Sequence, residues 1–326
     1  MDRRRFIGNG TLLALAAYAG RCGAQDVPRS SFGANATAEE VTAGIDLSGK
    51  TIVVTGCNSG IGLETMRVLA LRGAHVIGTA RTPERGQEAC AGIKGKATPV
   101  VLELSDFNSV VACANTIRAM NTPIDALVCN AGVLLTDLQQ VRGLELQFVV
   151  NHLGHFILVN RLLERVTAAP QGRVVVVGSV AHQGAPQGGI QFDNLSGKGW
   201  ERQAYSHSKL ANGLFSLELS TRLAGTRATS NSLHPGVVAT NIMRNLNFTP
   251  PAGGGNGRSP FGFAMETPAQ GAATSCYLAS SPTLGRVTGQ YFADCNPAQQ
   301  SNYQKDPAMA AKLWQVSEEL TRPYLA

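Results

Sequence analysis

Short aliphatic runs alternate with segments of helical periodicity from residue 51 onward, and this alternation constrains the fold more than any other feature. The aliphatic runs cover residues 51–55, 74–80, 98–102, 125–129, 173–177, 229–233 and 289–292. The segments between them repeat apolar residues at helical spacing. Continuous apolar strands that alternate with helices are typical of a parallel sheet covered on both faces. The sequence therefore predicts an α/β fold: a single doubly wound domain over residues 46–326, with a parallel seven-stranded sheet.

The N-terminal segment differs in character from this domain. Residues 3–7 read Arg-Arg-Arg-Phe-Ile, and residues 11–19 form an uncharged, mainly apolar run. The order resembles a twin-arginine export signal, although Asp2 stands where Ser or Thr is usual. The run is shorter than the ~20 residues that span a bilayer. We expect a signal over residues 1–24, a linker over residues 25–45 and a periplasmic protein.

Three alternatives to this export signal stay open: a Sec signal, an uncleaved N-terminal membrane anchor, and a cytoplasmic protein whose start codon was misassigned. No later stretch reaches transmembrane length, so no membrane span is predicted once the signal is removed.

Charge and cysteine content exclude two classes of function. The chain carries a formal net charge of +6, and four Arg with one Asp in the first 24 residues supply +3 of it. The other +3 is spread thinly, so no nucleic-acid partner is predicted. The seven cysteines form no Cys-x-x-Cys pair and no cluster with zinc spacing, so no metal site is predicted. We expect free, packed thiols, with disulfides as the alternative outside the cytoplasm.

A glycine-rich turn between the first strand and the first helix indicates a nucleotide site. It reads Thr55-Gly56-Cys57-Asn58-Ser59-Gly60-Ile61-Gly62. Its glycines let the backbone approach a pyrophosphate, and the helix N-terminus offers free N–H groups. The second strand ends at Arg81 rather than at a carboxylate. Because a guanidinium suits a 2′-phosphate, the sequence favours NADP(H) over NAD.

Residues with catalytic chemistry lie at the ends of later strands. Tyr205 and Lys209 are four apart on a predicted helix, so the ammonium can lower the pKa of the phenol. Ser179 follows the strand 173–177, where its hydroxyl could hold a substrate oxygen. Asn151, in an otherwise apolar predicted helix over residues 143–166, could hold a buried water. Small residues in Asn130-Ala131-Gly132 would let a cofactor lie close.

Together these motifs resemble the short-chain dehydrogenase/reductase family. The turn from Thr55 to Gly62, Asn130-Ala-Gly132, Asn151, Ser179, Tyr205-x-x-x-Lys209 and His234-Pro235-Gly236 occur in the family's order. The resemblance implies a Rossmann fold, a nicotinamide cofactor and a Ser-Tyr-Lys-Asn tetrad.

The resemblance also implies a role for each site residue. Tyr205 would be the general acid/base, Ser179 would orient the substrate oxygen, and Lys209 would bind the nicotinamide ribose and lower the tyrosine pKa. Asn151 would support a water relay, and Pro235-Gly236 would contact the nicotinamide end. Glu103 stands at the adenine-facing position, where Asp is usual.

Four further runs are similar to the retinol dehydrogenase and protochlorophyllide reductase branch: residues 151–155, 179–182, 207–212 and 291–295. That branch implies NADP(H) and hydrophobic carbonyl substrates. The sequence thus predicts an NADP(H)-dependent oxidoreductase that interconverts a hydrophobic aldehyde or ketone and its alcohol. An NAD-dependent alcohol dehydrogenase and a non-catalytic nucleotide-binding regulator are the alternatives.

Two expectations concern the outside of the domain. The Pro- and Gly-rich stretch at about 245–263 is expected to be a lid loop over the substrate. Family members are often dimers or tetramers through the helices that carry Asn151 and Tyr205, so a homo-oligomer is compatible with the resemblance.

Overall fold

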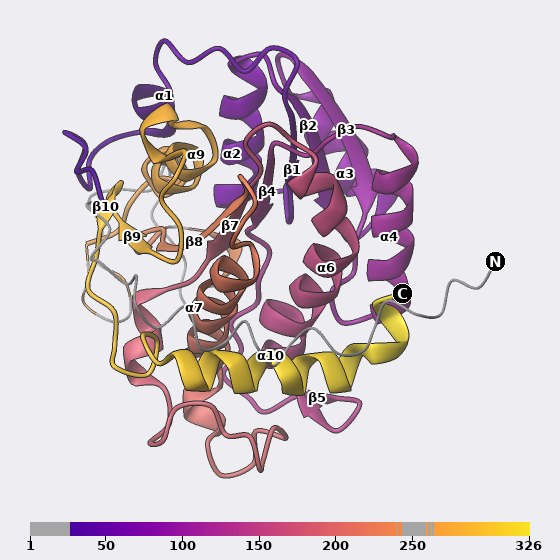
Figure 1. Ribbon diagram of the computed structural model, residues 1–326, viewed down its shortest axis with the longest axis vertical. Coiled ribbons are helices and arrows are strands. Elements are labelled where there is room, and N and C mark those ends of the chain that lie inside the picture. The colour runs from indigo at the N-terminus through magenta and orange to yellow at the C-terminus, as the bar shows by residue number, and fades with distance from the viewer. Residues whose placement is uncertain (1–26, 239, 243–258, 260–261, 263) are drawn as a thin grey trace.

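The computed structural model describes residues 27–238, 240–242, 259, 262 and 264–326 (Figure 1). The expected signal at residues 1–24 lies outside the described residues, as does almost all of the expected lid at 245–263.

An eight-stranded sheet forms the centre of the domain, in the order β10-β9-β8-β7-β4-β1-β2-β3. All neighbouring strands are parallel except β9 and β10. The strands are β1 (Thr51–Val54), β2 (His75–Ala80), β3 (Lys96–Val101), β4 (Ala126–Cys129), β7 (Arg173–Val177), β8 (Thr229–His234), β9 (Tyr291–Ala293) and β10 (Asn296–Pro297).

The predicted doubly wound α/β fold is confirmed, with one strand more than the seven expected. The additional strand, β10, is two residues long and polar, too short to show periodicity in the sequence. It pairs with β9 because Asp294 and Cys295 adopt left-handed backbone angles, φ 51° and 61°, and reverse the chain.

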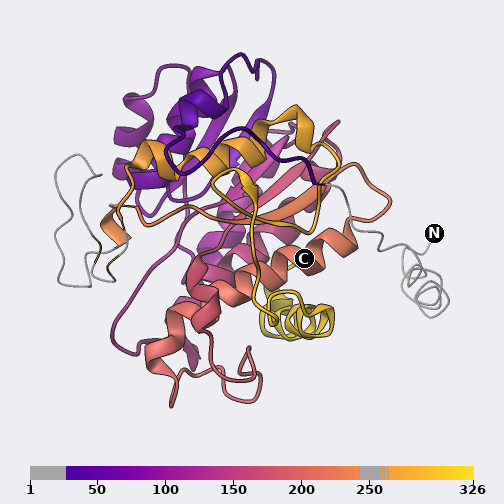
Figure 2. The same ribbon diagram turned by 90° about the vertical axis from the view of Figure 1, so that its left-hand side faces the viewer.

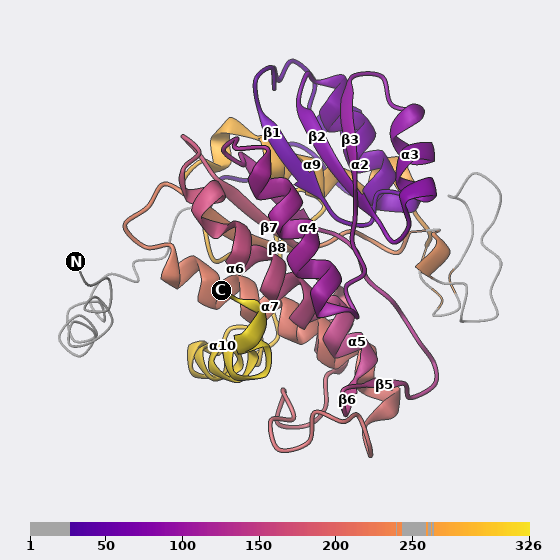
Figure 3. The same ribbon diagram turned by 90° about the vertical axis from the view of Figure 1, so that its right-hand side faces the viewer.

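Helices cover both faces of the sheet (Figures 1 to 3). Adjacent residues of β1 show the division, since Val53 faces one hydrophobic core while Ile52 and Val54 face the other. The core around Val53 holds α4 (Phe107–Ala119), α6 (Gly154–Thr167), α7 (Ala204–Arg222) and α10 (Pro307–Thr321). The opposite core holds α1 (Ala38–Val41), α2 (Gly60–Leu71), α3 (Pro83–Ala91) and α9 (Ala273–Ser280), and α8 (Pro268–Gly271) contacts α1, α2 and α9. Short 3₁₀ turns are η2 (Val180–Gly184), η3 (Glu201–Gln203), η5 (Pro282–Leu284) and η6 (Arg322–Tyr324).

Residues 25–45 were expected to form a linker. The described part of this segment, residues 27–45, packs onto the domain instead. The Phe32 ring meets the Tyr277 ring edge-on, with 6.1 Å between centroids. The Asn296 side chain accepts from Ser30 N and donates to Phe32 O, both at 2.9 Å. A Thr37 capping box begins α1. These contacts join distant parts of the chain, which is why a segment without periodicity read as a linker.

The single helix expected over residues 143–166 is also wrong. A hairpin of β5 (Gln140–Val141) and β6 (Leu144–Glu145) comes first, and its turn residues Arg142 and Gly143 have φ of 56° and 77°. A short helix α5 (Leu146–Phe148) and a π-helical turn η1 (Val149–Leu153) then lead into α6 (Figure 3). The π turn places Asn151 at its centre, and such turns are frequent at functional sites.

Candidate active site

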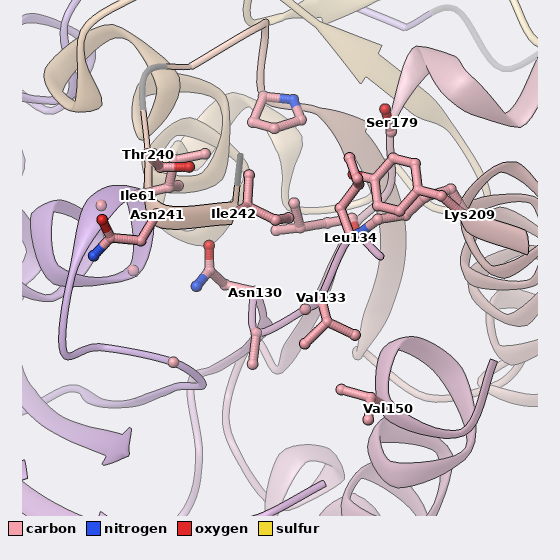
Figure 4. A pocket seen from close by; sticks show the side chains of 18 of the residues that line it. Ile61, Asn130, Val133, Leu134, Val150, Ser179, Lys209, Thr240, Asn241 and Ile242 are labelled. Carbon is pink, nitrogen blue, oxygen red and sulfur yellow. The ribbon is translucent and has the colours of Figure 1, made fainter. Parts of the chain in front are cut away.

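A cavity of about 1090 Å³ opens at the carboxyl edge of the sheet, where the strand order reverses between β1 and β4. Figure 4 shows Ile61 and Asn241 at one side of it, and Ser179 and Lys209 at the other. It brings together all the predicted site residues except two. Its lining includes Gly56, Asn58, Ser59, Gly60, Ile61, Gly62, Arg81, Glu103, Asn130, Ala131, Gly132, Ser179, Tyr205, Lys209, Pro235 and Gly236. The exceptions, Thr55 and Asn151, are fully buried.

The glycine-rich turn forms a tight cradle. A Cβ on Gly62 would lie 2.2 Å from Gly56 O and 2.5 Å from Asn130 Nδ2, so only glycine fits. Gly56 has φ +72°, a left-handed conformation that favours glycine. Ser59 is the N-cap of α2 and its side chain makes no capping bond. The first N–H groups of α2 are thus left for a ligand, and the cradle fits a dinucleotide pyrophosphate.

Two arginines line the cavity near the end of β2. Arg81 was predicted, whereas Arg85, in the first turn of α3, was missed although it stands four residues further on. Among the residues that the structure describes, neither arginine takes part in an ion pair. The nearby Glu103 carboxylate accepts from Ser105 N at 3.0 Å and Ser105 Oγ at 2.8 Å. Two unpaired guanidinium groups form a suitable anion site.

The predicted catalytic groups come from β7 and α7. Ser179 lies two residues beyond the end of β7, and Tyr205 and Lys209 lie one turn apart on α7. The Lys209 ammonium lies 5.6 Å from the centre of the Tyr205 ring and donates to Val177 O at 3.0 Å. Burial raises the pKa of Tyr205 to about 12, and a hydrogen bond with Ser179 acts in the opposite direction. Burial lowers the pKa of Lys209 to about 8.

The pKa shift of Tyr205 differs from the lowering expected from Lys209. Desolvation of the phenol is the largest effect, and the ammonium binds a main-chain carbonyl instead of the phenol oxygen. At neutral pH the phenol therefore holds its proton and is positioned to donate it.

Asn151 lies beneath the cavity and does not line it. Its Oδ1 accepts from Val133 N at 2.8 Å, and its Nδ2 donates to Val133 O at 3.0 Å and to Ser208 Oγ at 2.9 Å. Two of these bonds hold the loop after β4, and the third joins Asn151 to α7.

The catalytic end of the cavity has an apolar wall that the sequence analysis missed. Val133, Leu134 and Val150 lie on the same side of the view as Lys209 in Figure 4, and Leu135, Val180 and Ile242 extend the lining. These residues come from loops and turns, where apolar residues carry no periodic signal. A second missed residue is Glu266, whose carboxylate occupies the space that a Cβ on Gly236 would need. Burial raises the pKa of Glu266 to about 7.

Three further structural findings bear on the site. Within the described ranges, no group of three or more His, Cys, Asp or Glu side chains could hold a metal ion. No helix in the same ranges has the length and apolar character to cross a membrane. The six described cysteines are free thiols; Cys22 lies outside the described residues.

Curated relatives match almost the whole chain. A short-chain dehydrogenase, TIC 32 A of Brassica napus chloroplasts, is 39% identical over 307 residues, covering 90% of this chain and 95% of the relative. Human retinol dehydrogenase 11 is 38% identical over 290 residues, covering 86% of this chain and 88% of the relative.

Solved structures share the fold. A structure of an uncharacterized Mycobacterium paratuberculosis protein has a TM-score of 0.69 and 32% identity, covering 86% of this chain and 97% of that one. A Beutenbergia cavernae protein proposed to be an NAD(P)-dependent gluconate 5-dehydrogenase, with NADP bound, has a TM-score of 0.58 and 28% identity, covering 76% of this chain and 96% of that one. The family model for short chain dehydrogenases matches residues 50–250. With the glycine cradle and the Ser-Tyr-Lys site already in place, this chain belongs to the short-chain dehydrogenase family, in its retinol dehydrogenase-like branch.

Proposed function

We propose that the protein is an NADP(H)-dependent oxidoreductase that interconverts a hydrophobic aldehyde or ketone and its alcohol. One observation carries the proposal: a single cavity joins the glycine cradle and two arginines to Ser179 and Tyr205 beside an apolar wall. Ser179 and Tyr205 can bind a carbonyl oxygen, and the cradle can bind a dinucleotide.

The chain's own residues handle the substrate oxygen and its proton. When bound, a nicotinamide cofactor supplies or accepts the hydride. Tyr205 donates its phenolic proton to the carbonyl oxygen in reduction and takes it back in oxidation. Ser179 lines the same cavity as Tyr205, so its hydroxyl can donate a second hydrogen bond to the same oxygen. The charge of Lys209 stabilises the phenolate that forms in reduction.

The preference for NADP(H) rests on the adenosine side of the cavity. Arg81 and Arg85 offer two guanidinium groups, and β2 ends without a carboxylate that could bind the ribose hydroxyls of NAD. NADP bound to the Beutenbergia relative supports the same preference. Replacing Arg81 by Ala is expected to raise KM for NADPH about tenfold or more and to leave KM for NADH nearly unchanged. Equal effects on both nucleotides would contradict the assignment.

The substrate class rests on the apolar wall around Val133, Leu134 and Val150. Human retinol dehydrogenase 11, a relative at 38% identity, supports a hydrophobic alcohol or aldehyde. Each Å² of apolar substrate surface that this wall removes from water contributes about 25 cal/mol to the binding free energy, which favours extended apolar substrates over small polar ones.

The deciding experiment follows oxidation of NADPH, then NADH, with long-chain, aromatic and retinoid-like aldehydes and ketones. We expect NADPH turnover that rises with the apolar size of the carbonyl and falls at least about 100-fold in Tyr205→Phe. Phe retains the ring and its packing, so it serves as the matched variant. Tight NADPH binding without turnover of any carbonyl would favour the nucleotide-binding regulator, and an NADH preference would favour the NAD-dependent alternative.

We also propose export to the periplasm by the twin-arginine route, because Arg-Arg-Arg-Phe-Ile at residues 3–7 is followed by an uncharged, mainly apolar run at residues 11–19. That route carries folded proteins, so a bound nucleotide can travel inside the enzyme. Cell fractionation should find the protein in the periplasm and the Arg3→Lys, Arg4→Lys double variant in the cytoplasm. Wild-type protein confined to the cytoplasm with Met1 intact would contradict the export proposal.

A further inference from the structure

His155 is a buried histidine beneath the cavity, in the first turn of α6, with 2% of its surface exposed. Its Nε2 lies 2.9 Å from Thr55 Oγ1, and its Nδ1 lies 3.1 Å from the carbonyl oxygen of Asn151. We propose that His155 is a positioning residue that joins the nucleotide-binding turn to Asn151. The loop that it positions is residues 130–133, here called the β4 loop.

The hydroxyl of Thr55 determines the direction of this chain of hydrogen bonds. Thr55 Oγ1 accepts from Asn130 N and Ala131 N, both at 2.9 Å, which occupies its two lone pairs. Its own proton must therefore go to a third partner. His155 Nε2 at 2.9 Å is a better acceptor than Val128 O at 3.5 Å.

The tautomer of His155 follows from this direction. Because Nε2 accepts, Nδ1 carries the hydrogen and donates it to the Asn151 carbonyl. Burial lowers the pKa of His155 to about 4, and the charge of Lys209 acts in the same direction, while the bond to Asn151 opposes them. The neutral ring thus keeps the acceptor that Thr55 needs at neutral pH.

Two links hold the β4 loop from beneath. Asn151 binds both main-chain polar groups of Val133, and His155 acts through Thr55 on the N–H groups of Asn130 and Ala131. Both links start from neighbouring turns of one helix. Since the β4 loop lines the cavity along its whole length, a small shift of it moves both the nucleotide floor and the apolar wall.

The test compares two buried histidines of the same helical segment. His155→Phe removes the link, whereas His152→Phe removes a buried hydrogen bond to Ser317 Oγ, at 2.8 Å, outside the site. The kinetic part rests on the proposed NADP(H)-dependent activity. We expect His155→Phe to weaken NADPH binding and lower kcat/KM by about 10- to 100-fold. His152→Phe should lower the melting temperature while leaving kcat/KM within about threefold. Equal kinetic effects of the two variants overturn the proposal.

Rescue and coupling separate positioning from general damage. His155→Gln retains a polar side chain at this position and should recover part of the activity. Thr55→Val and His155→Phe remove the same link, so their combined effect on NADPH affinity should be well below the product of the two single effects. Full additivity overturns the proposal, and if His155→Phe fails to fold, His155→Gln takes its place in the cycle.

A last readout is independent of any activity. Nitrogen NMR of the imidazole should show a neutral ring with hydrogen on Nδ1 down to about pH 5.5. Hydrogen on Nε2, or a charged ring at pH 6, overturns the proposal even in an active enzyme. If the protein shows the expected tautomer but no turnover, the positioning role of His155 stands and only the proposed function is contradicted.

Discussion

Lys209 Nζ and Asn212 Nδ2 donate to the same main-chain oxygen, that of Val177, at 3.0 Å and 3.1 Å. Val177 is the last residue of β7, and Ser179 follows two residues later. One carbonyl at the sheet edge therefore fixes Lys209 relative to the strand that precedes Ser179. The position of the Lys209 ammonium is thus set by a main-chain contact.

Because Lys209 and Asn212 share the Val177 oxygen, we predict that Lys209→Met lowers activity without lowering stability. Burial lowers the pKa of Lys209, so the buried ammonium costs stability at neutral pH, and methionine has a similar shape without that charge. The Val177 oxygen keeps its bond from Asn212. We expect an unchanged or higher melting temperature with kcat lowered about 100-fold or more. Calorimetry and NADPH turnover on the same preparation measure both, and a large loss of stability would contradict this view of Lys209.

A second prediction concerns Arg173, a buried arginine of β7 whose side chain caps the C-terminal end of α9. Its guanidinium donates to Leu278 O at 2.9 Å and Ser281 O at 2.7 Å, and burial lowers its pKa to about 10. Arg173→Met leaves both oxygens without this donor, so we expect a loss of about 1–3 kcal/mol in the free energy of unfolding. Urea denaturation measures it, with Arg165→Met as control because Arg165 makes an exposed bond at 3.4 Å. Equal losses in the two variants would show that the capping contacts contribute little.

The sheet, and the residues that meet in the cavity at its edge, could be predicted because their signals are local. Buried strands are continuous apolar runs, and Tyr205 with Lys209, or Gly56 with Gly62, are a few residues apart. The roles of Arg173 and Asn151 could not be predicted. Arg173 and Leu278 are 105 residues apart in the chain, so their contact leaves no trace in local spacing.

The π turn shows the same limit at shorter range. Apolar residues surround Asn151 as in an ordinary helix, and only its contacts with Val133 and Ser208 reveal how it is used. Residues 27–45 read as a linker because their partners, Tyr277 and Asn296, are supplied by the far end of the chain.

A third prediction concerns the oligomeric state. Helix α10 lies across α6 and α7, as Figure 1 shows, and Trp314 on it packs against Phe156 and Phe215 with centroids 4.9 Å and 5.8 Å apart. The family resemblance implies dimers through the helices that carry Asn151 and Tyr205, and here α10 packs on α6 and α7. We expect light scattering to give the mass of one chain. A dimer that cross-linking places on α6 and α7 would contradict this expectation.

The last prediction is that the protein loses stability in mild acid because its buried histidines take up protons only when the chain unfolds. Burial lowers the pKa of His152 and His207 to about 3 and that of His155 and His234 to about 4. An unfolded histidine titrates near about 6.5, so the unfolded chain binds more protons than the folded one below that pH. Stability is then unaffected by these groups above about pH 6.5 and falls as the pH drops toward about 4.

Most carboxylates are ionised in both states at pH 5.5 and leave this proton balance unchanged. Glu266 differs, because burial raises its pKa to about 7, so it holds a proton in the folded state and releases about one on unfolding. We expect unfolding at pH 5.5 to take up a net of at least about two protons, since each of these four histidines becomes about nine-tenths charged and Glu266 gives back about one proton. Calorimetric unfolding in buffers of different ionisation enthalpy measures this uptake directly. His152→Phe, which lacks one such group, should take up about one proton fewer. An uptake near zero at pH 5.5 would mean that the histidines are charged in the folded protein, contrary to their burial.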